Sequence, residues 1–103
     1  MYLVHAHLKS RVPDAEPPSD LALLVRQHAL PEEAVEHLVL HANAQPEPVI
    51  GVYVLARYLE EAERVAGAVV ARALAAEPSL RHWELTVAQV PLLAQPVGDV
   101  WMD

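Results

Sequence analysis

The chain of 103 residues has the length of one domain with a single hydrophobic core, and 53% of its residues are hydrophobic. Its formal net charge is −7, from 14 acidic and 7 basic residues with no cluster of Lys and Arg, so the sequence argues against binding to nucleic acid or to an anionic membrane surface. The absence of cysteine excludes disulfides, thiolate metal sites and thiol chemistry.

The first nine residues, MYLVHAHLK, lack the basic lead and the apolar run of a signal peptide. No stretch of 18 consecutive apolar residues is present, so we expect no membrane-spanning segment and a cytoplasmic location. Aromatic residues make up only 5% and Phe is absent, so Ala, Val and Leu must fill the core. These side chains bury little area each, which favours a modestly stable domain that associates with itself.

Residues 2–8, YLVHAHL, alternate with the period of two that is typical of a strand. One face of this strand is apolar, and the other carries His5 and His7. Residues 9–18 contain three prolines and alternating charges, which indicates an exposed loop.

A short helix is predicted over residues 19–29, because the Ser-Asp pair at its start can cap it and Pro31 disfavours helical geometry just before itself. Residues 31–44, PEEAVEHLVLHANA, allow two interpretations. As a helix they have proline in the first position, two glutamates in the first turn and one apolar stripe. As a strand, residues 36–41 alternate between leucine on one face and histidine on the other. We favour the strand, with residues 43–48 as the turn of a hairpin.

Residues 49–56 are apolar on both faces, as expected of a central strand that is covered twice. Residues 58–76 show the longest helical pattern, with a stripe of small and apolar residues opposite glutamate and arginine. A fourth strand is predicted over residues 82–90, where Trp, Leu and Val alternate with other residues. Residues 91–103 then form an extended tail with one large apolar residue, Trp101.

The predicted order is strand, helix, strand, strand, helix, strand. In this order, and in the patterns YLVHAHL, PVIGVYVLA and RYLEEAERVAGAVVARAL, the chain resembles the ferredoxin-like α+β fold, in particular the dimeric α/β-barrel proteins that use it. The resemblance covers about residues 1–90 as a single domain, followed by the tail at residues 91–103. It implies a βαββαβ fold with a four-stranded antiparallel sheet of order 4-1-3-2 and both helices on one face. The opposite face then meets a partner's sheet or encloses a pocket with it.

The period of two assigns five of the six histidines to the face without helices. Its residues are expected to be Leu3, His5, His7, Val35, His37, Val39, His41, Val49, Gly51, Tyr53, Leu55, His82, Glu84, Thr86 and Ala88.

His5 and His7 project from one side of a strand, and Glu84 is expected on its neighbour. Two histidines and a carboxylate can bind one divalent metal ion. The same groups can transfer protons, so the catalytic candidates are His5, His7, Tyr53 and Glu84. The alternative is a structural or interface role, in which Tyr53 fills an interface with its hydroxyl satisfied. No zinc-protease, serine-hydrolase or phosphate-loop motif is present.

Two functional hypotheses follow. The first is a non-catalytic accessory or regulatory protein without a cofactor, which acts as a homodimer or through a protein partner. The second is a small enzyme or a ligand- or metal-binding protein with its pocket on the histidine-rich face. A minor possibility is an interface that separates when its histidines are protonated. The predicted interface residues are Val35, His37, Val39, His41, Val49, Tyr53, Leu55 and Trp101.

Overall fold

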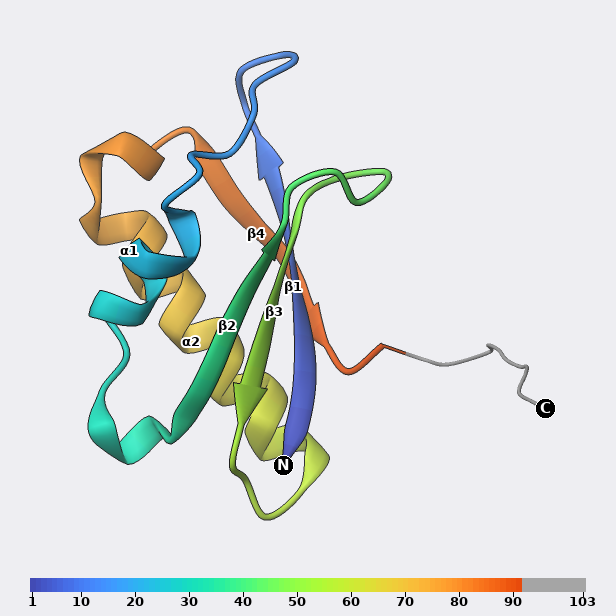
Figure 1. Cartoon of the computed structure of the whole chain (residues 1–103), viewed down its shortest axis with the longest axis vertical. Coiled ribbons are helices and arrows are strands. Elements are labelled where there is room, and N and C mark those ends of the chain that lie inside the picture. Colours follow the sequence, from blue (N-terminus) through green and yellow to red (C-terminus); the bar gives the residue numbers. More distant parts are fainter. Residues whose placement is uncertain (92–103) are drawn as a thin grey trace, which may run out of the picture.

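One antiparallel sheet carries two helices on one of its sides in the computed structural model, which describes residues 1–91 (Figure 1). The strands lie in the order β2-β3-β1-β4, with every neighbouring pair antiparallel. Two short 3-10 turns, η1 and η2, precede β2 and β4. The elements are β1 (Tyr2–Ser10), α1 (Leu21–Gln27), η1 (Pro31–Glu33), β2 (Val35–His41), β3 (Val49–Val54), α2 (Leu59–Ala76), η2 (Pro78–Leu80) and β4 (Trp83–Gln89).

This arrangement confirms the predicted α+β fold, with its βαββαβ order and its 4-1-3-2 sheet. The predicted tail, with Trp101, falls outside the described residues from residue 92 onward. Neither of the two α-helices within residues 1–91 combines the length and the apolar character needed to cross a bilayer.

The alternation of β1 builds the hydrophobic core. Val4, Ala6 and Leu8 are fully buried beneath the helices, whereas the residues between them are only partly covered. Ile50 and Val52 of β3 lie on the same side and are also fully buried. The small residues of α2 allow that helix to lie close to the sheet. The buried residues that the two helices contribute are Leu21, Val25, Ala62, Ala66, Val69, Val70, Ala73 and Leu74.

Residues 31–44 contain a strand, as we favoured, rather than a helix. The turn η1 ends at Glu33, and the positive φ of 55° at the next residue, Ala34, takes the backbone out of right-handed helical geometry. The chain then pairs with β3, and Leu38 and Leu40 pack toward the core. Pairing with a central strand and burial of two leucines therefore outweigh the favourable proline and glutamate positions at the start of the alternative helix.

An irregularity between β1 and β4 moves two residues to faces that the sequence period does not predict. The register shifts between His7 and Leu8, so that Val87 lies opposite His7 and Ala88 lies opposite Ala6. Ala88 consequently packs against the core, and its predicted position on the other face is wrong. The cause is a bulge, which adds one residue to β4 and reverses the alternation beyond it.

A second bulge has the same effect at the start of β2. The register shifts between Val35 and His37, and Val35 lies opposite Val54, which is fully buried. Val35 therefore packs against the core, and its predicted place on the face without helices is wrong.

Polar contacts attach the α1–β2 connection to α2. Arg72 Nη2 donates to Glu33 Oε2 at 2.7 Å, and Arg72 Nη1 donates to Glu33 Oε1 at 3.0 Å and to the carbonyl of His28 at 2.6 Å. Beside this pair, His28 Nε2 lies 2.7 Å from Glu77 Oε2. The hydrogen bond from Arg72 lowers the pKa of the Glu33 carboxyl. We call Arg72, Glu33, His28 and Glu77 the helix-side clamp.

Candidate functional site

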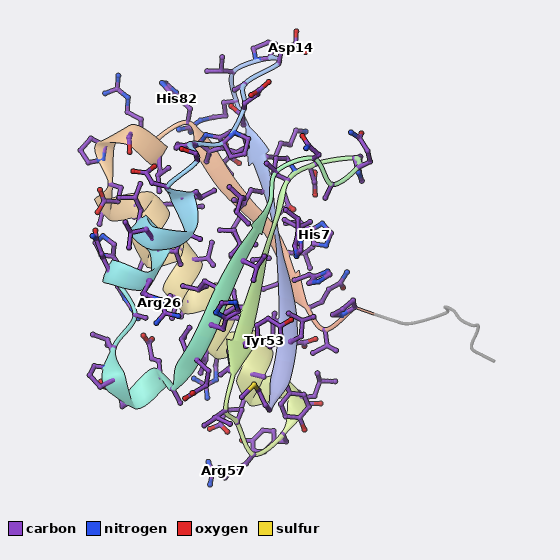
Figure 2. All side chains as sticks on the ribbon, viewed as in Figure 1. His7, Asp14, Arg26, Tyr53, Arg57 and His82 are labelled. Carbon is purple, nitrogen blue, oxygen red and sulfur yellow. The ribbon has the colours of Figure 1, made fainter. Side chains whose placement is uncertain are left out.

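The candidate site is the side of the sheet that faces away from α1 and α2, which we call the open face. Its strand register forms three rows across β1, β3 and β2. Figure 2 shows His7 projecting on this side, away from both helices. The rows are His7–Val49–His41, His5–Gly51–Val39 and Leu3–Tyr53–His37.

Three imidazoles gather at one end of the open face. The ring centre of His5 lies 6.5 Å from that of His7 and 6.0 Å from that of His41. We call these three residues the histidine cluster. Val49 belongs to the same end and is only 5% exposed, although it is not part of the core on the helix side. The three histidines therefore form a patch of their own with Val49 on the open face, in which Val49 is buried and His41 is exposed.

The lack of a side chain at Gly51 allows this packing. A Cβ atom there would lie 3.3 Å from Leu3 Cδ1 and 3.5 Å from His41 Nε2. Both side chains thus lean over the glycine, which agrees with its predicted role as a close-packing position within a strand.

An open hollow of about 630 Å³ lies between the histidine cluster and the β2–β3 hairpin. Its walls include the three imidazoles, Val49 and hairpin residues 42–45. Because imidazole rings and apolar side chains both line the hollow, it can accept a small molecule that forms hydrogen bonds.

Glu47, from the same hairpin, is the carboxylate closest to the cluster. Its Oε2 atom lies 3.6 Å from His7 Nδ1 and 3.2 Å from the hydroxyl of Thr86, which lies at the same distance from the carbonyl oxygen of His7 and can donate to either. The sequence predicts residues 43–48 only as a turn, and its pattern does not predict this contact. The antiparallel register is the signal that could have revealed it, since the residues just before Val49 must pass beside His7.

The histidine cluster changes the acidity of its central member. The pKa of His5 is lowered from 6.5, first because the ring is partly buried and then because His41 and His7 repel its positive form. A ring of this kind is neutral near neutral pH and can both donate and accept a hydrogen bond.

Glu84 does not join His5 and His7. It lies opposite Lys9 in the ladder, and its Oε2 atom lies 3.5 Å from Arg11 Nε. Within residues 1–91, no three His, Asp or Glu side chains are placed so that they could share a metal ion. The predicted set of His5, His7 and Glu84 is therefore not assembled.

The remaining predicted histidines divide between the open face and a turn. His37 lies on the open face with its ring centre 5.7 Å from that of Tyr53, at the opposite end from His7. His82 lies just before β4, where its carbonyl accepts a hydrogen bond from the amide of Arg11, so its predicted position on this face is wrong. Figure 2 shows it near the loop that carries Asp14.

Several predicted interface residues lie on the open face, namely His37, Val39, His41, Val49 and Tyr53. Leu55 does not, because β3 ends at Val54. It is 49% exposed and lines a separate depression with Arg57 and Glu61. Trp101 lies outside the described residues. Val87, which the period of two assigned to the helix side, lies on the open face with 40% of its surface exposed.

Comparisons with protein-family models, with curated proteins and with solved structures found no match to this chain. The open face must therefore be interpreted from its own chemistry. It offers apolar surface and imidazoles, and none of the positions in its three rows is acidic, lysine or arginine.

Proposed function

We propose that this chain is a small accessory or regulatory protein that acts through self-association, with the open face of one copy packed against the open face of a second. The observation that carries the proposal is that both helices cover the same side of the sheet (Figure 1). Leu3, Val39 and Tyr53 are left half-buried on the other side, and Val87 is exposed. A sheet with apolar residues on both faces is normally covered on both. Within residues 1–91 no element covers the open face, and a second copy can supply that layer.

Charge favours a second copy over a charged partner. The whole chain carries −7, so two copies repel each other over most of their surfaces. The three rows of the open face bear no carboxylate, and the nearest ones, Glu47 and Glu84, lie at its margins. Two copies therefore meet at this face without bringing like charges together.

The size of the face sets the expected affinity. Four strands about 4.8 Å apart and about seven residues long form a patch of roughly 20 by 23 Å. Treated as flat, two such patches bury on the order of 900 Å² in total, and the uneven surface of the side chains adds to this area. The value is close to the lower limit of about 1,000 Å² for a specific interface. We therefore expect a reversible dimer with a Kd in the range of about 1 to 100 µM.

Val87→Glu tests the proposal, with Val12→Glu as its matched control. Both valines are exposed to nearly the same extent, 40% and 42%, but only Val87 lies on the open face. Sedimentation equilibrium at pH 8 is expected to show a dimer for the native chain and for Val12→Glu. Val87→Glu is expected to weaken association by at least about tenfold, because each copy must bury or pair the new carboxylate. A native chain that stays monomeric at about 500 µM, or equal Kd values for the two variants, would refute the proposal.

The convergence of three imidazoles on a hollow supports a second candidate, the binding of a small neutral molecule that forms hydrogen bonds. A panel of small amides, alcohols and heterocycles tests it through the thermal midpoint of the protein. Compounds that bind in the hollow should raise the midpoint of the native chain and of His82→Gln, but not that of His5→Gln. Shifts that survive His5→Gln, or no shift with any compound, would count against this candidate.

A further inference from the structure

The histidine cluster lies on the surface that the proposed self-association would bury. His5 and His7 come from β1 and His41 from β2, and their rings lie around Val49 at one end of the open face. Burial removes water from these rings, and an imidazolium loses far more solvation than a neutral imidazole. The protonation of the cluster therefore opposes the contact.

We propose that protonation of His5, His7 and His41 separates the two copies, so that the chain associates at pH 8 and dissociates toward pH 5.5. This inference rests on the proposed self-association through the open face. It makes the cluster the regulatory element of that contact.

The charged groups around the cluster support this direction. From the hairpin, Glu47 approaches His7 at 3.6 Å. From β4, the residues opposite His7 and His5 are Val87 and Gln89, which carry no charge. Lys9 and Glu84 come two ladder pairs further along, and Glu84 Oε2 lies 3.5 Å from Arg11 Nε. From the central strand, the cluster meets only Val49 and Gly51. The titratable groups at the other end of the open face are His37 and Tyr53.

Within residues 1–91, one carboxylate thus lies near three imidazoles. Glu47 Oε2 lies 3.6 Å from His7 Nδ1, and the hydroxyl of Thr86 lies 3.2 Å from the same carboxylate oxygen. His5 and His41 have no such partner among residues 1–91, and each repels a charge on the other. At least two of the three rings must therefore lose their protons before the open face is buried.

The expected change is large. Even a single imidazole of ordinary pKa, about 6.5, that must stay neutral in each of the two copies raises Kd about 100-fold between pH 8 and pH 5.5, so this is the smallest change expected. The net charge of −7 predicts the opposite trend, because acid reduces the general repulsion between copies and tightens a contact that does not depend on histidine. A Kd that rises in acid therefore indicates histidine protonation, and a Kd that falls indicates reduced repulsion between the net charges.

The test is the Kd of self-association, measured by sedimentation equilibrium between pH 8 and pH 5.5 with EDTA present, so that no metal ion can bridge histidines. The chains are the native protein, the triple variant His5→Gln, His7→Gln, His41→Gln, the single variant His41→Gln and the control His82→Gln. Circular dichroism at each pH checks that the fold is kept. The single variant provides the comparison in case the triple variant does not fold.

The native chain and His82→Gln are expected to lose affinity about 100-fold or more, with a midpoint in the range where histidine titrates. The triple variant should change less than about threefold, and His41→Gln should lie between the two. A native dimer whose Kd is unchanged or lower at pH 5.5 would overturn this inference and leave the proposed self-association standing. A pH effect that is equally large in the histidine variants would also overturn it. A native chain that is monomeric at pH 8 would overturn both proposals.

Discussion

The two sides of the sheet use histidine in different ways. On the helix side, the ring of His28 is fixed by Glu77 at 2.7 Å, and its carbonyl accepts a hydrogen bond from Arg72. On the open face, His5 and His41 form no side-chain hydrogen bond with any residue in the range 1–91, and His7 has only Glu47 nearby at 3.6 Å. A histidine whose ring forms hydrogen bonds within the domain stabilises the fold. A histidine without such bonds can exchange protons with solvent and can contact a partner.

The first way to test this comparison is to make the same substitution, Val to Ala, on each face of β3. Val52 is fully buried against the helices, and Val49 is buried beneath imidazoles on the open face. Val52→Ala should lower the free energy of unfolding by about 2 to 3 kcal/mol, because the packed core cannot close the cavity. Val49→Ala should cost less than about half of that, since the histidine side chains above it can move inward. Urea denaturation followed by circular dichroism measures both values. Equal losses would show that the open face is as rigid as the core.

The second test breaks the helix-side clamp. Arg72→Ala removes both hydrogen bonds to Glu33 and the one to the carbonyl of His28. Glu33 then keeps its charge with only 13% of its side chain exposed. The thermal midpoint should fall by about 4 °C.

Arg64→Ala is the matched control for the clamp. Arg64 is also on α2, but it is exposed. Its replacement should shift the midpoint by less than about 2 °C. If the two arginine variants melt at the same temperature, the clamp does not hold the helix side together.

The third test uses the pKa of Glu33, which the hydrogen bond from Arg72 lowers from 4.5. A carboxyl with a lowered pKa in the folded state binds fewer protons there than in the unfolded chain. Its stabilising effect is therefore complete above about pH 4.5 and is lost as the pH falls through the folded-state value.

Glu33→Gln should accordingly reduce the difference in unfolding free energy between pH 7 and pH 3.5. The reduction should be a few tenths of a kcal/mol, because Arg72 is 37% exposed and water screens its charge. Glu60→Gln, on the exposed side of α2, should leave the difference unchanged. An effect of Glu60→Gln as large as that of Glu33→Gln would attribute the pH dependence to net charge rather than to the clamp.

The fold was predictable because its main signals are local. The alternation of β1, the stripe of α2 and the hairpin between β2 and β3 each determine an element. The sheet order was expected from the resemblance of the element order to the ferredoxin-like fold, and the structure has that order. The strand at residues 35–41 was the one ambiguous element. Helix and strand patterns compete there, and only pairing with β3 decides between them.

The site was less predictable because it depends on register. One extra residue in β4 and one in β2 exchange the faces of Val87, Ala88 and Val35, and a period of two contains no sign of either bulge. Glu84 lies opposite Lys9 rather than His7, which also follows only from the register. Contacts between side chains distant in sequence, such as Glu47 with His7, follow only after the register is known.

The smallest expected effect is also the most direct measure of the open face. The pKa of His5 is lowered mainly by burial and then by repulsion from His41 and His7. His41→Gln removes one of these charges and should raise the pKa of His5, which should nevertheless stay below 6.5 because burial is unchanged. Proton NMR titration of the imidazole signals measures it, in a sample dilute enough to remain monomeric.

His82→Gln is the control for this titration, because His82 lies in the turn before β4 and away from the cluster. It should leave the pKa of His5 unchanged. A His5 pKa that did not respond to His41→Gln would mean that the two rings do not interact in solution. The histidines of the open face would then titrate independently, each hydrogen-bonded to water. They would differ from His28 on the helix side only in how far their rings are exposed to solvent.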